Sequence, residues 1–170
     1  MTDRRPAPLA DRSRMTLIEN ARLIDPEAGT ERPGTLLIRG DTIARIYDGT
    51  VPADDPLLRG TDRIDAGGRC LAPGIVDLGV KVSEPGERHK ESFGSAGLAA
   101  AAGGVTTMVT RPDTDPAIDT PEVLEFVARR ANADSPVRVL PMAALTRGRQ
   151  GREMVEIGFL MDAGAVAFTD

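Results

Sequence analysis

The sequence predicts an α/β protein in which a small β unit precedes a parallel sheet wound with helices. Three observations support this prediction. Short β-branched runs separated by turn residues fill the chain from Met15 to about Gly68. After Gly68, strand and helix patterns alternate, and strand starts recur about every 30 residues, the size of one βαβ unit. Aromatic residues make up only 3% of the chain, whereas Ala, Val, Leu and Gly are plentiful, which favours aliphatic α/β layers.

The first part of the chain divides into a leader and the small β unit. Residues 1–14 mix Arg, Asp, Pro and Ser with little apolar periodicity, so we expect a disordered leader. Residues 15–70 should form the β unit, with turns at Asp25-Pro26, Arg39-Gly-Asp41 and Asp48-Gly49. We expect antiparallel strands at 16–18, 22–24, 34–38 and 42–47.

The segment 74–82 is the one that organises the second part of the chain. It is dense in Val, Ile and Leu and ends at Glu84-Pro-Gly, a composition typical of a central parallel strand buried on both faces. Strand side chains alternate, so four of them should share one face: Asp77, Gly79, Lys81 and Ser83. The last three lie at the carboxyl end, where barrels and open α/β sheets carry their chemistry.

The remaining elements follow in βα order. Helices are expected at 90–102, 123–131 and 152–162, and strands at 105–110, 137–143 and 164–168. The pair Gly103-Gly104 follows a helix and precedes a strand, the wrong order for a nucleotide loop, so we assign it to helix capping and packing. The last predicted strand leaves an open sheet edge, which suggests the front part of a longer protein; a complete four-strand domain is the alternative.

Net charge, cysteine content and the first residues of the sequence narrow the expected binding partners and cellular location. The net charge of −5 removes any electrostatic reason to expect nucleic acid or an anionic membrane. Cys70 is the single cysteine, so neither an internal disulfide nor a pair of thiols for a zinc knuckle is available. Arg4 and Arg5 are followed by Pro6-Ala-Pro8 in place of an apolar run, so we expect no secretory signal and a cytoplasmic location.

Several blocks of the chain carry a resemblance to a known family. They are 77–86, 89–91, 101–107, 119–126, 139–146 and 164–170. In this order they resemble the dihydroorotases of the amidohydrolase superfamily, over about residues 16–170. The resemblance implies a (β/α)8 TIM-type barrel with a small β-sandwich made from both chain ends. Residues 71–170 would then be the first four β/α units of that barrel.

The resemblance also implies a metal motif from which this sequence departs. Active members carry His-x-His on the first barrel strand, where both imidazoles project to one side and hold a zinc ion that activates water against a cyclic amide. This sequence has Gly79 and Lys81 at those positions. Ser83 replaces a substrate-binding arginine, and Arg111-Pro-Asp-Thr114 replaces Met-Pro-Asn-Thr. We expect the acid at Asp113 to repel an anionic substrate.

These departures fall on the catalytic positions, whereas the packing motifs are retained. We therefore interpret the chain as part of a non-catalytic dihydroorotase homologue of pyrimidine biosynthesis. The resemblance implies an oligomer in which it scaffolds an aspartate carbamoyltransferase, with no cofactor. The rival interpretation is an active zinc-dependent dihydroorotase or related cyclic amidohydrolase whose ligands come from other positions. A fragment with no independent role is a third.

Individual residues carry narrower hypotheses. Asp170 is the one position that matches a metal ligand of the family. The alternative to a ligand role is a solvated carboxylate. The Lys81 ammonium should fill the metal position and pair with Asp170, Asp77 or Asp113, unless it simply snorkels from the rim. His89, without co-ligands, is expected at the surface or as a helix cap. The basic loop 147–152 is expected to be solvated, with a partner-facing surface as the alternative.

Overall fold

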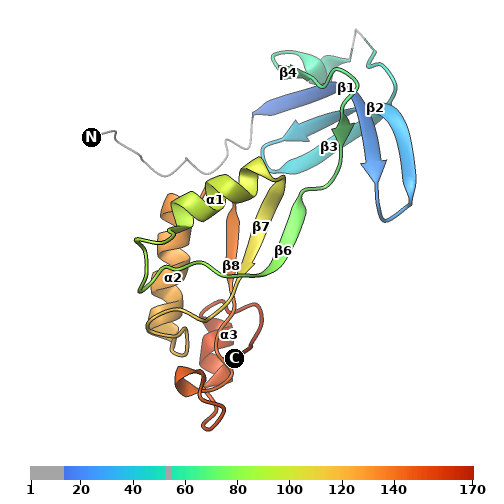
Figure 1. The fold of residues 1–170 in the computed structure, drawn as a ribbon. Helices are drawn as coiled ribbons and strands as arrows, with labels where there is room; N and C mark the ends of the chain where they lie inside the picture. Colours follow the sequence, from blue (N-terminus) through green and yellow to red (C-terminus); the bar gives the residue numbers. More distant parts are fainter. Residues whose placement is uncertain (1–13, 53–54) are drawn as a thin grey trace. The chain divides into compact units, whose positions relative to one another are not determined.

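The computed structural model describes residues 14–52 and 55–170, and the chain divides after Pro73 into two compact units (Figure 1). Most of the predicted leader, residues 1–13, lies outside the described residues. Arg14, its last residue, is described: its Nε donates to Asp62 Oδ2 at 2.8 Å and its carbonyl accepts from the Gly40 amide at 2.8 Å. None of the helices within the described ranges has the length and apolar run needed to cross a membrane.

The first unit is a five-stranded sheet. Its strands are β1 (Met15–Asp25), β2 (Thr30–Arg39), β3 (Thr42–Asp48), β4 (Asp62–Asp65) and β5 (Cys70–Leu71). The first three pair antiparallel, as predicted, but β4 and β5 both run parallel to β1. The prediction of an all-antiparallel unit is therefore wrong, because the chain crosses back after β3 and then runs alongside β1 in the same direction.

The two strands predicted at 16–18 and 22–24 form the single strand β1. Asn20 lies between them with a φ of 55°, and the register with β2 shifts at the same place. A residue in the left-handed region bends a strand without ending it, and Asn tolerates this conformation better than most residues. The sheet packs Leu17, Leu37 and Tyr47 into a small core.

The second unit alternates strands and helices as the sequence predicts. Its elements are β6 (Ile75–Val80), α1 (Phe93–Ala102), β7 (Val105–Thr110), α2 (Pro121–Asp134), β8 (Arg138–Pro141) and α3 (Ile157–Asp162), with a short 3-10 turn at Arg147–Arg149. The strands form a parallel sheet in the order β6-β7-β8. This is the winding of the first part of a (β/α)8 barrel, and the β-rich first unit precedes it, so the predicted fold class is confirmed.

Local sequence determines where the helices begin and end. Ser92 caps α1 in a reciprocal capping box with Ser95, and α1 ends at Gly103. Gly104 follows with a φ of 79°, a conformation that a residue with a Cβ adopts at a cost. Pro121 is the first residue of α2, where its missing N–H leaves no hydrogen bond unmade. The buried faces of α1, α2 and α3 enclose one apolar core against the sheet.

Two predicted elements near the end of the chain are shorter than expected. The helix predicted at 152–162 begins at Ile157, because Met154 pairs with Thr146 in an isolated bridge. The strand predicted at 164–168 is reduced to a single parallel bridge between Ala143 and Phe168. Backbone hydrogen bonds still join residues 166–169 to residues 141–145, but they form only this one bridge and no regular ladder.

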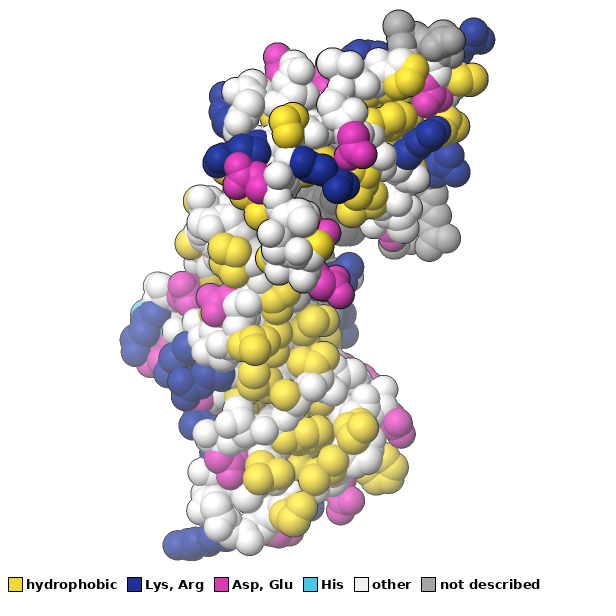
Figure 2. Space-filling view, turned by 90° about the vertical axis from the view of Figure 1, so that its right-hand side faces the viewer, with side chains coloured by type: hydrophobic (Ala, Val, Ile, Leu, Met, Phe, Trp, Pro, Cys, Tyr) yellow, Lys and Arg dark blue, Asp and Glu magenta, His cyan; other side chains and the backbone are white. Residues whose placement is uncertain are grey.

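The prediction that segment 74–82 is a central strand buried on both faces is wrong. β6 lies at the edge of its sheet and pairs with β7 alone in the described residues. Ile75, Val76 and Leu78 are therefore 55%, 56% and 73% exposed. Figure 2 shows hydrophobic side chains gathered over this face of the second unit. In a closed barrel every strand has two neighbours, so the apolar composition of β6 matches a closed barrel better than an open edge.

A bulge at Gly79 interrupts the alternation of side chains along β6. Leu78 pairs with Val109 and Val80 pairs with Thr110, so Gly79 is skipped in the ladder, and its φ is 86°. The expectation that four side chains of a regular strand share one face is therefore wrong. The strand also ends at Val80, so Lys81 lies in the loop that follows it.

We predict that Gly79→Ala lowers the free energy of unfolding by about 1 to 3 kcal/mol, because alanine is strained at this φ although nothing crowds the added methyl group. Gly158→Ala is the matched control. Gly158 lies in α3 with open space around it, so alanine there should be neutral or stabilise by up to about 1 kcal/mol. Urea unfolding of both variants measures the difference, and equal effects would contradict the strained conformation.

Candidate functional site

The candidate site lies in the loops that follow β6 and β7, at the carboxyl edge of the parallel sheet. A cavity of about 290 Å³ opens between these loops. Its lining consists of Lys81, Ser83, Pro85 and Glu87 from the first loop and Asp113, Thr114 and Asp115 from the second. Parallel strands bring such loops together at one edge, so the fold assembles here residues that lie about 30 positions apart in the sequence.

Asp113 is the carboxylate of this cavity that two cations contact. Its Oδ2 lies 3.4 Å from Lys81 Nζ and 3.2 Å from Arg111 Nη2. The Asp113 side chain is only 10% exposed, whereas those of Lys81 and Arg111 are 54% and 43% exposed. Asp113 Oδ1 is buried and has no hydrogen-bond partner among the described residues. Two half-exposed cations therefore share one oxygen of a buried carboxylate.

This arrangement changes two expectations from the sequence. Of the three partners proposed for Lys81, only Asp113 pairs with it in the described part of the chain. Asp77 is exposed on β6. The negative charge of Asp113 is also countered by Lys81 and Arg111, whereas Glu87 and Asp115 bring two further carboxylates to the lining. Any repulsion of an anion would therefore come from these two carboxylates more than from Asp113.

Asp170 is held by its own chain. Oδ1 accepts hydrogen bonds from the backbone amides of Leu145 and Thr146 at 3.1 and 3.0 Å, and Oδ2 accepts one from the Thr146 hydroxyl at 2.7 Å. The hydrogen bond from the Thr146 hydroxyl is the main reason that the pKa of Asp170 is lowered. Both carboxylate oxygens thus already have donors. The assignment of Asp170 as a metal ligand stays a prediction.

The other sequence candidates lie apart from the charge cluster. His89 is exposed in the loop before α1, and the cap of that helix is Ser92. Ser83 is half-buried in the cavity wall. In the basic loop, Arg147 Nε pairs with Glu153 Oε1 at 3.0 Å and both side chains are more than half exposed, as expected for a solvated segment. A role of this loop in binding a partner stays a prediction.

The residues of the site do not fit a zinc centre of the kind that the resemblance implies. Gly79 has no side chain, and the Lys81 ammonium is engaged with Asp113. Across residues 14–52 and 55–170, no three His, Cys, Asp or Glu side chains come close enough together to hold a metal ion. The donors required for zinc would have to come from elsewhere.

Sequence reasoning missed two residues of this region. Arg111 was treated only as part of an altered loop, although its place directly after β7 puts it at the carboxyl edge beside Asp113. Glu84 was treated as part of a turn, yet it is buried and paired with arginines. The signal for Arg111 was its position after a β-branched strand. No signal in the sequence pointed to Arg130 as a partner of Glu84, because it lies on α2, 46 positions further along the chain.

Comparison with known proteins identifies close relatives by sequence. A family profile described as "Dihydro-orotase-like" matches residues 68–170. The dihydroorotase of Sulfurihydrogenibium sp. (strain YO3AOP1) is 38% identical over 156 residues, which are 92% of this chain and 36% of that protein. The dihydroorotase of Bacillus caldolyticus is 43% identical over 132 residues, 76% of this chain and 31% of that protein. The chain therefore spans about a third of the length of these relatives.

Solved structures share the fold. L-hydantoinase (dihydropyrimidinase) from Arthrobacter aurescens superimposes with a TM-score of 0.72 at 27% identity, over 90% of this chain and 32% of that protein. N-acyl-D-glutamate deacylase from Bordetella bronchiseptica, solved with zinc and a phosphonate inhibitor, gives a TM-score of 0.56 at 18% identity, over 92% of this chain and 38% of that protein. At this lower identity the likeness supports the fold alone.

We predict that Lys81→Met lowers the free energy of unfolding by no more than about 1 kcal/mol, because Lys81 is half-exposed and Arg111 still faces Asp113. The control is Lys90→Met, which removes the similarly exposed lysine that pairs with Glu87. A double-mutant cycle with Asp113→Asn should give a coupling of about 0.2 to 1 kcal/mol between Lys81 and Asp113. A loss of about 3 to 5 kcal/mol for Lys81→Met would instead indicate a fully desolvated pair.

We predict that Asp170→Asn destabilises the full-length protein at pH 7 and that the difference from wild type closes in acid. The folded pKa of Asp170 lies below its ordinary value, so its contribution to stability is present above that value and is lost as the pH falls through the folded pKa. Melting temperatures measured from pH 7 down to pH 2 test this. Glu125→Gln, at an exposed carboxyl on α2, is the control. A difference that stays constant across this range would contradict the role of the charge.

Proposed function

The chain belongs to the dihydroorotase-like family, and we propose from that premise that it forms the first part of a non-catalytic dihydroorotase homologue in pyrimidine biosynthesis. In this role it scaffolds an aspartate carbamoyltransferase. The chain matches about a third of its curated relatives, so the proposal concerns the whole protein of which these residues form the described part.

The end of β6 is the observation that carries the proposal. An imidazole at position 79 would require a residue with a Cβ at a φ of 86°, where glycine is favoured. Lys81 brings an ammonium to the same edge, where it pairs with the buried Asp113. A metal cation placed among Lys81 and Arg111 would meet two positive charges and one carboxylate that is already shared. Both the backbone and the charges of this edge therefore favour a site without zinc.

The engagement of Asp170 supports the same proposal. A carboxylate binds a metal through oxygen lone pairs, and here donors from Leu145 and Thr146 occupy both oxygens. Three of the roughly four lone pairs of the Asp170 carboxylate accept hydrogen bonds, and the Thr146 hydroxyl that donates to Oδ2 itself accepts one from the Gly151 amide at 2.9 Å. This network gives Asp170 a structural role that needs no metal.

The partner, the oligomeric state and the cytoplasmic location are parts of the same proposal, supported by the family resemblance and the composition of the chain. The transferase and the oligomer come from the family resemblance. The acidic composition of the chain agrees with a protein partner better than with nucleic acid. The cytoplasmic location rests on the single cysteine, Cys70, which offers no internal disulfide.

An active cyclic amidohydrolase is the second candidate function. The observation that favours it is the structural likeness to L-hydantoinase, which extends over 90% of this chain. The chain covers only 32% of that enzyme, so most of the enzyme has no counterpart here. In a protein of similar length, zinc ligands contributed by the remaining two thirds would replace those lost at Gly79 and Lys81. This candidate predicts bound metal and turnover in the full-length protein.

We expect the full-length protein to contain less than about 0.1 zinc per chain and to hydrolyse no dihydroorotate. Elemental analysis and a dihydroorotate hydrolysis assay measure this, with the dihydroorotase of Bacillus caldolyticus as the positive control. The variant Lys81→His tests the charge at the edge of the cavity; on its own it should not raise zinc content, because Gly79 still supplies no second ligand. Stoichiometric zinc with turnover in the wild type would establish the second candidate instead.

The scaffolding role has its own test. Affinity-tagged full-length protein should retain an aspartate carbamoyltransferase from the same cell extract and from purified components. Retention should persist in Lys81→Met, because the cavity is not expected to form the interface. Zinc-free protein that binds no transferase from purified components would leave the chain non-catalytic but remove the proposed partner.

A further inference from the structure

Glu84 is the most deeply buried acidic side chain in the described ranges, with 4% of its surface exposed. A buried carboxylate is costly unless donors and opposite charges surround it, so its environment indicates what it does. Glu84 lies in the loop between β6 and α1, three residues after Lys81. It takes no part in the charge cluster around Asp113.

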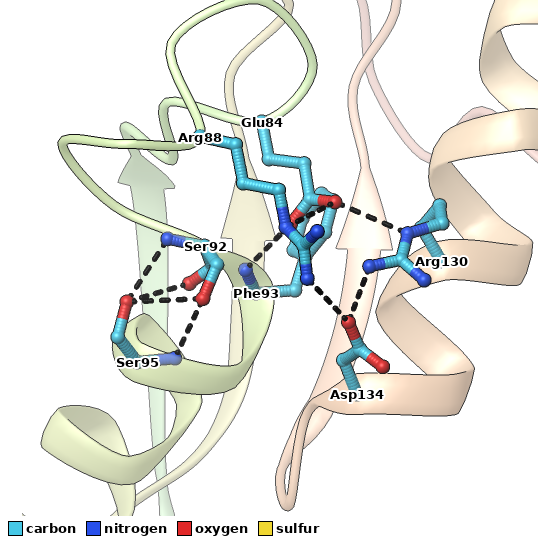
Figure 3. A network of polar contacts seen from close by, with 7 residues as sticks. All are labelled: Glu84, Arg88, Ser92, Phe93, Ser95, Arg130 and Asp134. Carbon is cyan, nitrogen blue, oxygen red and sulfur yellow. Dashed lines mark hydrogen bonds and ion pairs between the residues drawn. The ribbon is translucent and has the colours of Figure 1, made fainter.

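Three donors converge on this carboxylate, as Figure 3 shows. Oε2 accepts the backbone N–H of Phe93 at 3.1 Å, and Oε1 accepts Arg130 Nε at 3.1 Å. Arg88 Nε lies 3.4 Å from Oε1. Asp134 contacts both arginines from the other side, with its Oδ2 3.7 Å from Arg88 Nη2 and hydrogen-bonded to Arg130 Nη2. The contact with Glu84 is the main reason that the pKa of Arg130 is raised.

The donors come from three different segments. Phe93 is the first residue of α1, Arg130 belongs to α2, and Arg88 belongs to the same loop as Glu84. The arginine pair extends the contact to Asp134, the last residue of α2. One buried carboxylate therefore ties the loop after β6 to the start of one helix and the end of the next.

Four other residues of this loop line the cavity. Lys81, Ser83, Pro85 and Glu87 line it from the loop, and Asp113 faces them from the loop after β7. We propose that Glu84 is a positioning residue: its buried contacts with Phe93, Arg88 and Arg130 hold the loop so that Lys81 reaches Asp113. The cavity wall then depends on a carboxylate that does not line the cavity.

This inference does not rest on the proposed function, because a rigid loop serves a scaffold and an enzyme equally. It follows from the geometry of the chain. Only two residues lie between Lys81 and Glu84, so a displacement of Glu84 also displaces Lys81. Lys81 Nζ lies 3.4 Å from Asp113 Oδ2, so a small increase in this distance breaks the contact.

The test compares the chemical reactivity of two lysines. Lys81 and Lys90 are the two lysines of the sequence, and their side chains are 54% and 57% exposed. Lys90 pairs with Glu87 within one turn of the same loop, so its pair moves with the loop, whereas the partner of Lys81 lies on another loop. An amine held in an ion pair must leave its partner before it can attack an acylating reagent, so a lysine whose pair is lost reacts faster.

In full-length Glu84→Gln we expect the rate of acylation of Lys81, relative to that of Lys90, to rise about two- to fourfold. This factor corresponds to the loss of one partly exposed ion pair, here the pair of Lys81 with Asp113. Glutamine preserves the size of the side chain and its acceptor for Phe93 but removes the charge that holds both arginines. Peptide mass spectrometry at a temperature well below melting measures the two rates. A rise in this ratio supports the positioning role.

A second variant keeps the test decisive if Glu84→Gln does not fold. Arg88→Gln changes a side chain that is 63% exposed and removes one of the two cations at Glu84, so it should raise the same ratio by a smaller factor. Arg130→Lys, which keeps a cation beside Glu84, should leave the ratio closer to wild type. An unchanged ratio in folded Glu84→Gln or in Arg88→Gln, even with a lower melting temperature, would mean that Glu84 only stabilises the fold and would overturn the proposal.

Discussion

The left-handed backbone at Gly79 is the constraint on which the carboxyl edge of the sheet depends. The bulge there interrupts the regular pairing of β6 with β7, which resumes only at Val80 before the strand ends and Lys81 enters the following loop. A residue with a side chain would resist this conformation, and a regular strand would direct position 81 differently. The contact of Lys81 with Asp113 and the shape of the cavity both follow from this bend.

The carboxylates along this edge share one property, which is that the protein supplies their partners. Asp113 faces Lys81 and Arg111, and Asp170 accepts three hydrogen bonds from residues 145 and 146. Glu84 is held by two arginines and a helix N–H. Acids near the mouth of a barrel commonly hold metals or substrates. Here their charges are balanced by side chains and backbone, which supports a frame that keeps its shape without a bound ion.

Much of the second unit could be predicted because its signals are local. Strand β7 has the predicted bounds, and α2 begins at Pro121, whose fixed φ suits the first position of a helix. The errors arose where the outcome depends on neighbours. Composition alone does not reveal how many strands flank β6, and the parallel course of β4 and β5 depends on a crossover. The segment near Phe168 has apolar strand composition but only one bridge.

By itself the sequence determined the βα order, the resemblance to dihydroorotases and the loss of imidazoles at Gly79 and Lys81, because each of these is a matter of residue identity and spacing. The tertiary structure alone decided that Lys81 pairs with Asp113 and not with Asp170, and that Glu84 is buried between two helices. The physical reason is that ion pairs form between groups brought within a few ångströms by the winding of the chain, and a linear pattern carries no information on such distances.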